Sequence, residues 1–96
     1  MTIPIQRRWS YLFHLQPKSK GNLQTVIAEE LREYRKEHAL SQAQLAQKLQ
    51  ISVRSYIDLE HGLFLPSATT LLLFQLQLDD QELLCFLSSV EEALRS

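Results

Sequence analysis

From Asn22 onward, the apolar residues of this chain recur every three to four positions, which is the spacing of amphipathic helices. Polar residues that cap helices divide this region into short pieces. Ser41 with Gln44, and Asp79 with Glu82, have the spacing of a capping box, in which two side chains bond the free backbone N–H groups at a helix start. The chain beyond residue 21 is therefore predicted to fold as a series of short helices packed on one another.

Single residues mark the remaining boundaries. Asn22 is a predicted N-cap, and its helix is expected to end near His38. Ser52 caps a third helix that stops at Gly62, because glycine adopts a left-handed conformation without strain. A fourth helix begins at Pro66-Ser67. No stretch after residue 21 alternates like a strand, so we expect an all-α domain of five helices over residues 22–96.

Residues 1–21 follow another pattern. Trp9, Tyr11 and Phe13 occupy every second position, the period of an extended or strand-like segment with one aromatic face. A lone strand is not stable, so this N-terminal arm is expected to lie on the domain or to pair with a copy from another chain.

The net charge of −1 is unevenly distributed. Residues 1–28 carry four bases and no acid, whereas residues 29–96 carry six bases and eleven acids. A basic arm on an acidic body can reach nucleic acid, since cations near phosphates release condensed counterions. Alternatively, the four cations keep an aromatic segment in solution. The charge pattern leaves both interpretations open.

Several function classes find no support in the composition. The chain has 96 residues and one cysteine, Cys85, which excludes an internal disulfide framework and a four-thiolate zinc site. His14, His38 and His61 are too far apart in the sequence for a helical metal-binding pair, and two glycines cannot build a phosphate-binding loop. The longest apolar run, Leu71–Phe74, is too short for a membrane span or a secretory signal. We expect a small cytoplasmic domain that is not an enzyme and needs no metal or cofactor.

The helices that begin after Ser41 and Ser52 are short and closely linked, which is the arrangement by which a second helix enters the major groove of DNA. The segment Leu31–Leu49, continued by Ile51-Ser52 and ending in Leu59-Glu60-His61-Gly62, resembles the phage-repressor-like (XRE) helix-turn-helix family over roughly residues 23–84. This resemblance implies a repressor-like domain that binds double-stranded DNA and regulates transcription.

The resemblance also implies roles for single residues. Ser41 and Gln42 match the helix start that contacts a DNA phosphate, and Arg35 and Glu60 match an ion pair between the first and third helices. The outward residues of the third helix are the candidates for contact with bases and nearby phosphates: Val53, Arg54, Ser55, Ile57, Asp58 and His61.

Three of these residues have defined base preferences. Arg54 can bond both major-groove acceptors of guanine, a contact worth about 1–3 kcal/mol of discrimination. Val53 suits a thymine methyl group. Asp58 accepts from a cytosine amino group and otherwise repels the duplex.

Large apolar side chains exceed what a core of this size needs. The run Leu71–Phe74 occupies every side of one helical turn, so at least one of its members faces outward. We therefore predict a homodimer, which suits palindromic DNA; the alternative is that the arm folds back over the patch. The candidate interface residues are Trp9, Tyr11, Phe13, Leu63, Phe64, Leu65 and Leu73.

Two functions from different classes follow. The first is a sequence-specific, homodimeric DNA-binding regulator, including an antitoxin-type autorepressor whose aromatic arm or leucine patch holds a toxin. The second is a protein-interaction module that keeps the fold and binds little DNA, which Asp58 and the apolar loop Leu63–Leu65 would allow.

Overall fold

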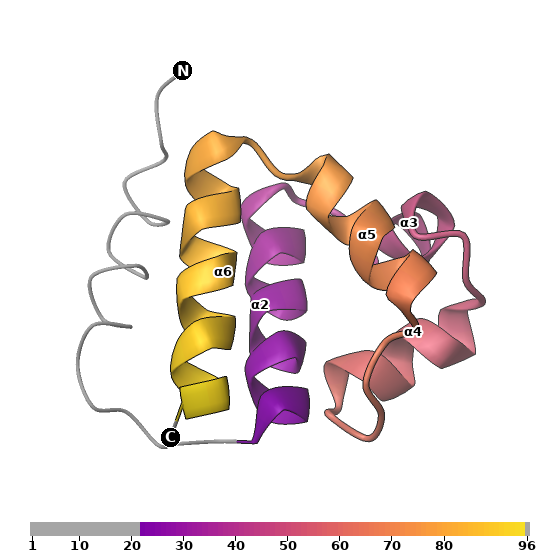
Figure 1. Cartoon of the computed structure of the whole chain (residues 1–96). Coiled ribbons are helices and arrows are strands. Elements are labelled where there is room, and N and C mark those ends of the chain that lie inside the picture. The colour runs from indigo at the N-terminus through magenta and orange to yellow at the C-terminus, as the bar shows by residue number, and fades with distance from the viewer. Residues whose placement is uncertain (1–21, 96) are drawn as a thin grey trace.

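Five helices follow one another along residues 22–95, the part of the chain that this computed structural model describes (Figure 1). No strand occurs in these residues, so the all-α prediction is confirmed. The predicted arm, with Trp9, Tyr11 and Phe13, lies outside the described residues. The helices are α2 (Leu23–Glu37), α3 (Gln42–Lys48), α4 (Val53–Glu60), α5 (Ala68–Gln77) and α6 (Asp80–Arg95).

Each helix begins at a polar residue that the sequence predicted. At α3, Ser41 Oγ accepts from the Gln44 backbone N–H at 3.0 Å, and Gln44 Oε1 accepts from the Ser41 N–H at 2.8 Å. Asp79 and Glu82 form the second predicted capping box, at 2.7 and 2.9 Å. The other three helices have single side-chain caps, from Asn22, Ser52 and Ser67.

The helices α2, α3 and α4 end in the same way, with one residue in the left-handed region. Gly62 has φ +72°, and the bonds from Gly62 N to Leu59 O and from Leu63 N to Asp58 O close the end of α4. Ala39 (φ 54°) and Gln50 (φ 60°) take the same conformation after α2 and α3. These two side chains make the turn more costly than glycine would.

An apolar residue follows each of these two turns. Leu40 follows Ala39 and Ile51 follows Gln50, and the side chains of Leu40 and Ile51 are partly buried against the core. An apolar contact at this position is the usual companion of a left-handed helix end. The two turns therefore direct one apolar side chain each into the protein.

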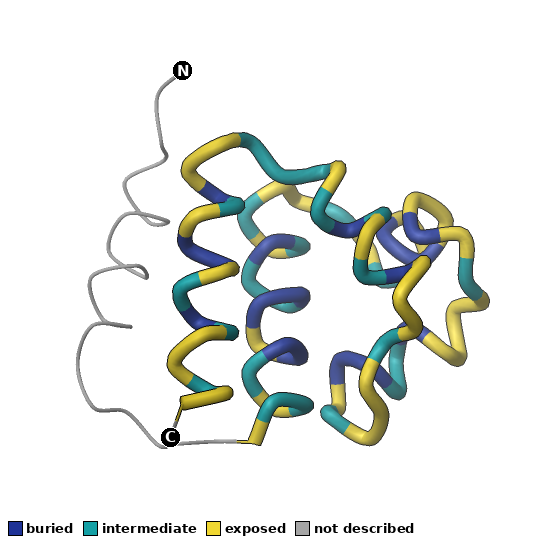
Figure 2. The backbone as a smooth tube through the Cα atoms, viewed as in Figure 1, coloured by how far each residue is buried: buried dark blue, intermediate teal, exposed yellow. Residues whose placement is uncertain are grey.

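The core lies where α2 faces α6 on one side and the pair of α3 and α4 on the other (Figures 1 and 2). Phe74 and Phe86 meet edge to face with ring centroids 5.3 Å apart, a favoured aromatic geometry. Leu45, Leu49 and Tyr56 are completely buried. None of the helices in residues 22–95 is long and apolar enough to cross a membrane.

Packing between the helices covers Glu30 and part of Leu73. Glu30 is buried where α6 packs on α2, and Ser89 Oγ donates to Glu30 Oε2 at 3.0 Å. Leu73, a candidate interface residue, is half-buried and packs against the core, and an interface role for it stays a prediction. The exposed leucines of α5 are Leu72 (60%) and Leu76 (78%), since each lies two positions, or about 200°, from the buried Phe74.

Candidate nucleic-acid interface

The helices α3 and α4 pack directly against each other and are joined by the short segment 49–52. Ala46, on the side of α3 that faces the protein, is 1% exposed, and its small side chain permits a close approach. Tyr56 and Leu59 are buried on the inner side of α4. The outer side of α4 is consequently presented to solvent.

Glu60, at the end of α4, joins three helices. Its Oε2 lies 2.5 Å from Arg35 Nε on α2, so the predicted ion pair is present, and it accepts from the Tyr56 hydroxyl at 2.5 Å. Its Oε1 accepts from Arg35 at 3.3 Å and from Gln42 Nε2, on α3, at 3.1 Å. One nearly buried carboxylate therefore fixes α4 relative to both α2 and α3.

The electrostatics of this cluster follow from its contacts. Burial by itself would raise the pKa of Glu60, but hydrogen bonds from Arg35, Tyr56 and Gln42 outweigh burial and hold that pKa below its ordinary value. The pKa of Arg35 is raised, chiefly by its hydrogen bond to Glu60. Burial, followed by the bond to the carboxylate, raises the pKa of Tyr56. Glu60 is thus ionised and Tyr56 is a neutral donor.

The start of α3 carries the two residues expected at a phosphate. Ser41 is exposed and acts as the N-cap, while Gln42 is half-buried and directed by Glu60. An amide group has two N–H donors, so the bond to Glu60 leaves the amide able to bond a second acceptor. Phosphate contact by either residue stays a prediction.

The candidate residues of α4 differ in exposure. The Arg54 side chain is 85% exposed, Val53 is 42% exposed, and Ser55 is also exposed. Ile57 and Asp58 are half-buried, and His61 is the exposed C-cap. The structure brings these residues together on the outer side of α4 and at its end, and Arg54 is the one arginine among them.

Comparison with known proteins identifies this arrangement. A family model described as Helix-turn-helix matches residues 31–78, half of the chain. The chain belongs to the XRE-type helix-turn-helix family. No curated protein and no solved structure matches it. Members of the helix-turn-helix family are DNA-binding regulators, and the matched segment runs from the middle of α2 to the end of α5.

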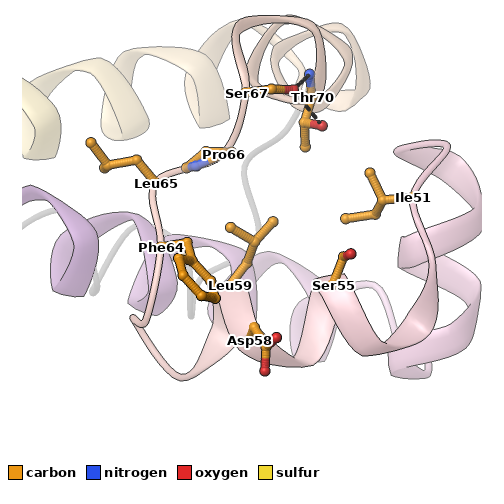
Figure 3. A pocket seen from close by; sticks show the side chains of 9 residues that line it. All are labelled: Ile51, Ser55, Asp58, Leu59, Phe64, Leu65, Pro66, Ser67 and Thr70. Atoms are coloured by element: carbon orange, nitrogen blue, oxygen red, sulfur yellow. Dashed lines mark hydrogen bonds between the residues drawn. The ribbon is translucent and has the colours of Figure 1, made fainter.

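The loop after α4 gives this helix-turn-helix an apolar flank. Leu63, Phe64 and Leu65 are 57%, 59% and 49% exposed. A cavity of about 270 Å³ lies between this loop, α4 and the start of α5. Figure 3 shows Phe64 and Leu59 at the cavity, with the Asp58 carboxylate directed away from Leu59. The apolar residues expected in this loop therefore stand at the surface, next to α4.

Two contacts of the helix-turn-helix were missed at the sequence level. The first is the bond that the buried Tyr56 hydroxyl donates to Glu60, four positions later. Arg54 Nε lies 3.6 Å from Asp58 Oδ1, again four positions later. Side chains four apart are neighbours on a helix, so the spacing alone carried the signal for both contacts.

Proposed function

We propose that this chain is a sequence-specific DNA-binding transcriptional regulator that acts as a homodimer and places α4 in the major groove of double-stranded DNA. The observation that carries the proposal is the contrast between the two sides of α4. Its inner side is tied to α2 and α3 through Glu60, while Arg54 projects 85% exposed from its outer side. A rigidly held helix with an exposed arginine is suited to reading base edges.

The flanking groups suit the same orientation. Ser41 and Gln42 stand at the N-terminus of α3, where backbone N–H groups favour an anion such as a phosphate. On α4, Arg54 matches the two acceptors of guanine, and Val53, 42% exposed, suits a thymine methyl group. Phosphate contacts would set the register, and α4 would supply the sequence preference.

The position of the uncovered apolar residues supports one dimer over another. Phe64 and Leu65 lie in the loop between α4 and α5, and Leu72 and Leu76 are exposed on α5. A dimer through these residues keeps two copies of α4 near the two-fold axis, as half-sites about 34 Å apart require. A dimer through α6, on the other side of α2 in Figure 1, would move the two copies of α4 apart.

Binding to random duplex DNA at about 50 and 200 mM salt tests the proposal. The wild type should bind at low salt and weaken at high salt, and Arg54→Ala should bind less tightly at low salt, because it removes a positive charge and leaves Asp58 unpaired on α4. Arg95→Ala is the matched control, because Arg95 is also an exposed arginine paired four positions away, on α6. Absence of binding by the wild type at low salt would contradict the proposal.

A second candidate function rests on α6. Leu84, Leu87 and Leu94 are 57%, 45% and 66% exposed on the helix that lies across α2 from α4. Such a stripe favours a protein partner, either a toxin held by an antitoxin-type autorepressor or the partner of an interaction module that binds little DNA. The antitoxin form is supported if Leu87→Ser still binds DNA but loses a protein that co-purifies with the wild type. The interaction module is supported if the wild type itself binds no DNA.

A further inference from the structure

Asp58 is an unexpected residue on a surface that is proposed to meet DNA. Its carboxylate repels phosphates, and its side chain is 21% exposed on the same helix as Arg54. The structure offers a reason for its presence: Asp58 Oδ1 lies 3.6 Å from Arg54 Nε. Four positions separate the two residues, so both side chains belong to one face of α4.

We infer that Asp58 is a positioning residue that sets base specificity, and that its carboxylate orients the Arg54 guanidinium toward guanine. This inference rests on the proposed function. The carboxylate lies on the Nε side of the guanidinium. The two terminal amino groups then remain free, and these are the groups that bond O6 and N7 of guanine together.

The difference in exposure between Arg54 and Asp58 indicates that Asp58 restrains Arg54, and not the reverse. Arg54 is long and 85% exposed, so by itself it samples many rotamers, whereas Asp58 is short and mostly covered. The less mobile carboxylate therefore restrains the more mobile cation. An arginine that is already oriented loses less freedom when it bonds a base, and it is less available to bond any phosphate within reach.

The charge of the pair has a second consequence. Arg54 and Asp58 together are neutral, so the pair adds little to sequence-independent attraction to DNA. The carboxylate also penalises placements in which Arg54 turns away and leaves Asp58 facing phosphates or base acceptors. Asp58 thus lowers the affinity for DNA of any sequence and raises the preference for one base, which is how a repulsive group contributes to specificity.

The experiment measures base preference in the wild type and in two variants that each lose one carboxylate, Asp58→Asn and Glu91→Gln. A duplex preferred by the wild type is first selected from a randomised library, and each guanine is then replaced in turn. We expect one guanine in each half-site to be preferred by the wild type about tenfold or more. Asp58→Asn should reduce that preference to within about threefold, while its affinity for random duplex rises, since a repulsive charge is lost.

Control variants separate positioning from folding and from charge. Glu91→Gln removes the partner of Arg95 on α6, the same kind of pair four positions apart, and should change neither the preference nor the random-duplex affinity. Asp58→Glu keeps a carboxylate within reach of Arg54 and should retain the guanine preference. Arg54→Lys keeps the charge but loses the planar fork, and should abolish the preference.

The outcomes distinguish this inference from the proposed function. If Asp58→Asn binds more tightly but keeps the full guanine preference, the carboxylate is only repulsive and the inference is wrong. If the wild type selects no sequence, or binds no duplex at low salt, the proposed function itself fails and the inference fails with it.

Discussion

Arg35 Nε on α2 lies 2.5 Å from Glu60 Oε2 on α4, although the two residues are 25 positions apart in the chain. The carboxylate is 4% exposed and the arginine side chain 18% exposed, so the pair is largely shielded from water. Water screens such a pair less than a surface pair. The orientation of α4, and with it the direction of Arg54, depends on this contact.

Glu60→Gln should destabilise the fold by about 2–3 kcal/mol at neutral pH, because buried hydrogen bonds to a charged group are lost and Arg35 keeps an unpaired charge. The folded-state pKa of Glu60 is lowered, so its contribution is fully present above the pKa of the unfolded chain and is lost as pH falls through the folded-state pKa.

Urea unfolding at several pH values measures this effect. The difference in unfolding free energy between the wild type and Glu60→Gln should be largest at pH 6–7 and shrink below about pH 4, near the ordinary carboxyl pKa. A difference that stays constant down to pH 3 would show that the ionised carboxylate is not the stabilising group.

Tyr56→Phe tests the hydroxyl contact on the same carboxylate. The ring is completely buried and stays in place, while the bond from the hydroxyl to Glu60 is removed. We expect a loss of about 1–2 kcal/mol in unfolding free energy. In the double variant with Glu60→Gln, the total loss should be smaller than the sum of the two single losses, because both changes weaken the same bond. Simple additivity in the double-mutant cycle would argue against a shared contact.

Ala39→Gly should stabilise the protein by about 0.5–1 kcal/mol. Ala39 has φ 54°, a conformation that costs an alanine about 1 kcal/mol or more and costs glycine little. Ala39 is exposed, so no packing is lost. Thermal unfolding measures the change. Ala43→Gly is the control, since Ala43 is exposed within α3 and glycine there should destabilise by up to about 1 kcal/mol. Equal effects of the two substitutions would contradict this interpretation of the turn.

The double substitution Leu72→Ser with Leu76→Ser should shift the proposed dimer toward monomer by at least tenfold in dissociation constant. These side chains are 60% and 78% exposed, so the monomer should keep its stability. Sedimentation equilibrium measures the shift. The matched control, Leu84→Ser with Leu87→Ser, changes two exposed leucines on α6 and should leave the dimer intact. A dimer that dissociates only in the control would place the interface on α6 instead.

The helix boundaries were predictable because they depend on residues that are close together in the sequence. The capping boxes at Ser41 and Asp79 each involve residues three positions apart, so the local pattern contains the whole interaction. The predicted pair of Arg35 with Glu60 came from family resemblance, since no local rule joins residues so distant.

Other features could not be read from the sequence. In α5, Leu71, Leu72 and Leu73 are equally apolar, so no periodicity distinguishes the exposed Leu72 from its neighbours. The bond between His38 and Glu82, at 2.7 Å, joins residues 44 positions apart and depends on how α6 returns along α2. Tertiary packing alone determines such contacts.

The most direct test of the central claim, that the outer side of α4 meets DNA, is an NMR titration of the full-length chain with duplex DNA. Backbone amide signals of Gln42 and of Val53–Asp58 should shift strongly, while those of α6 around Leu87 change little. Shifts confined to α6, or no shifts at low salt, would contradict the account.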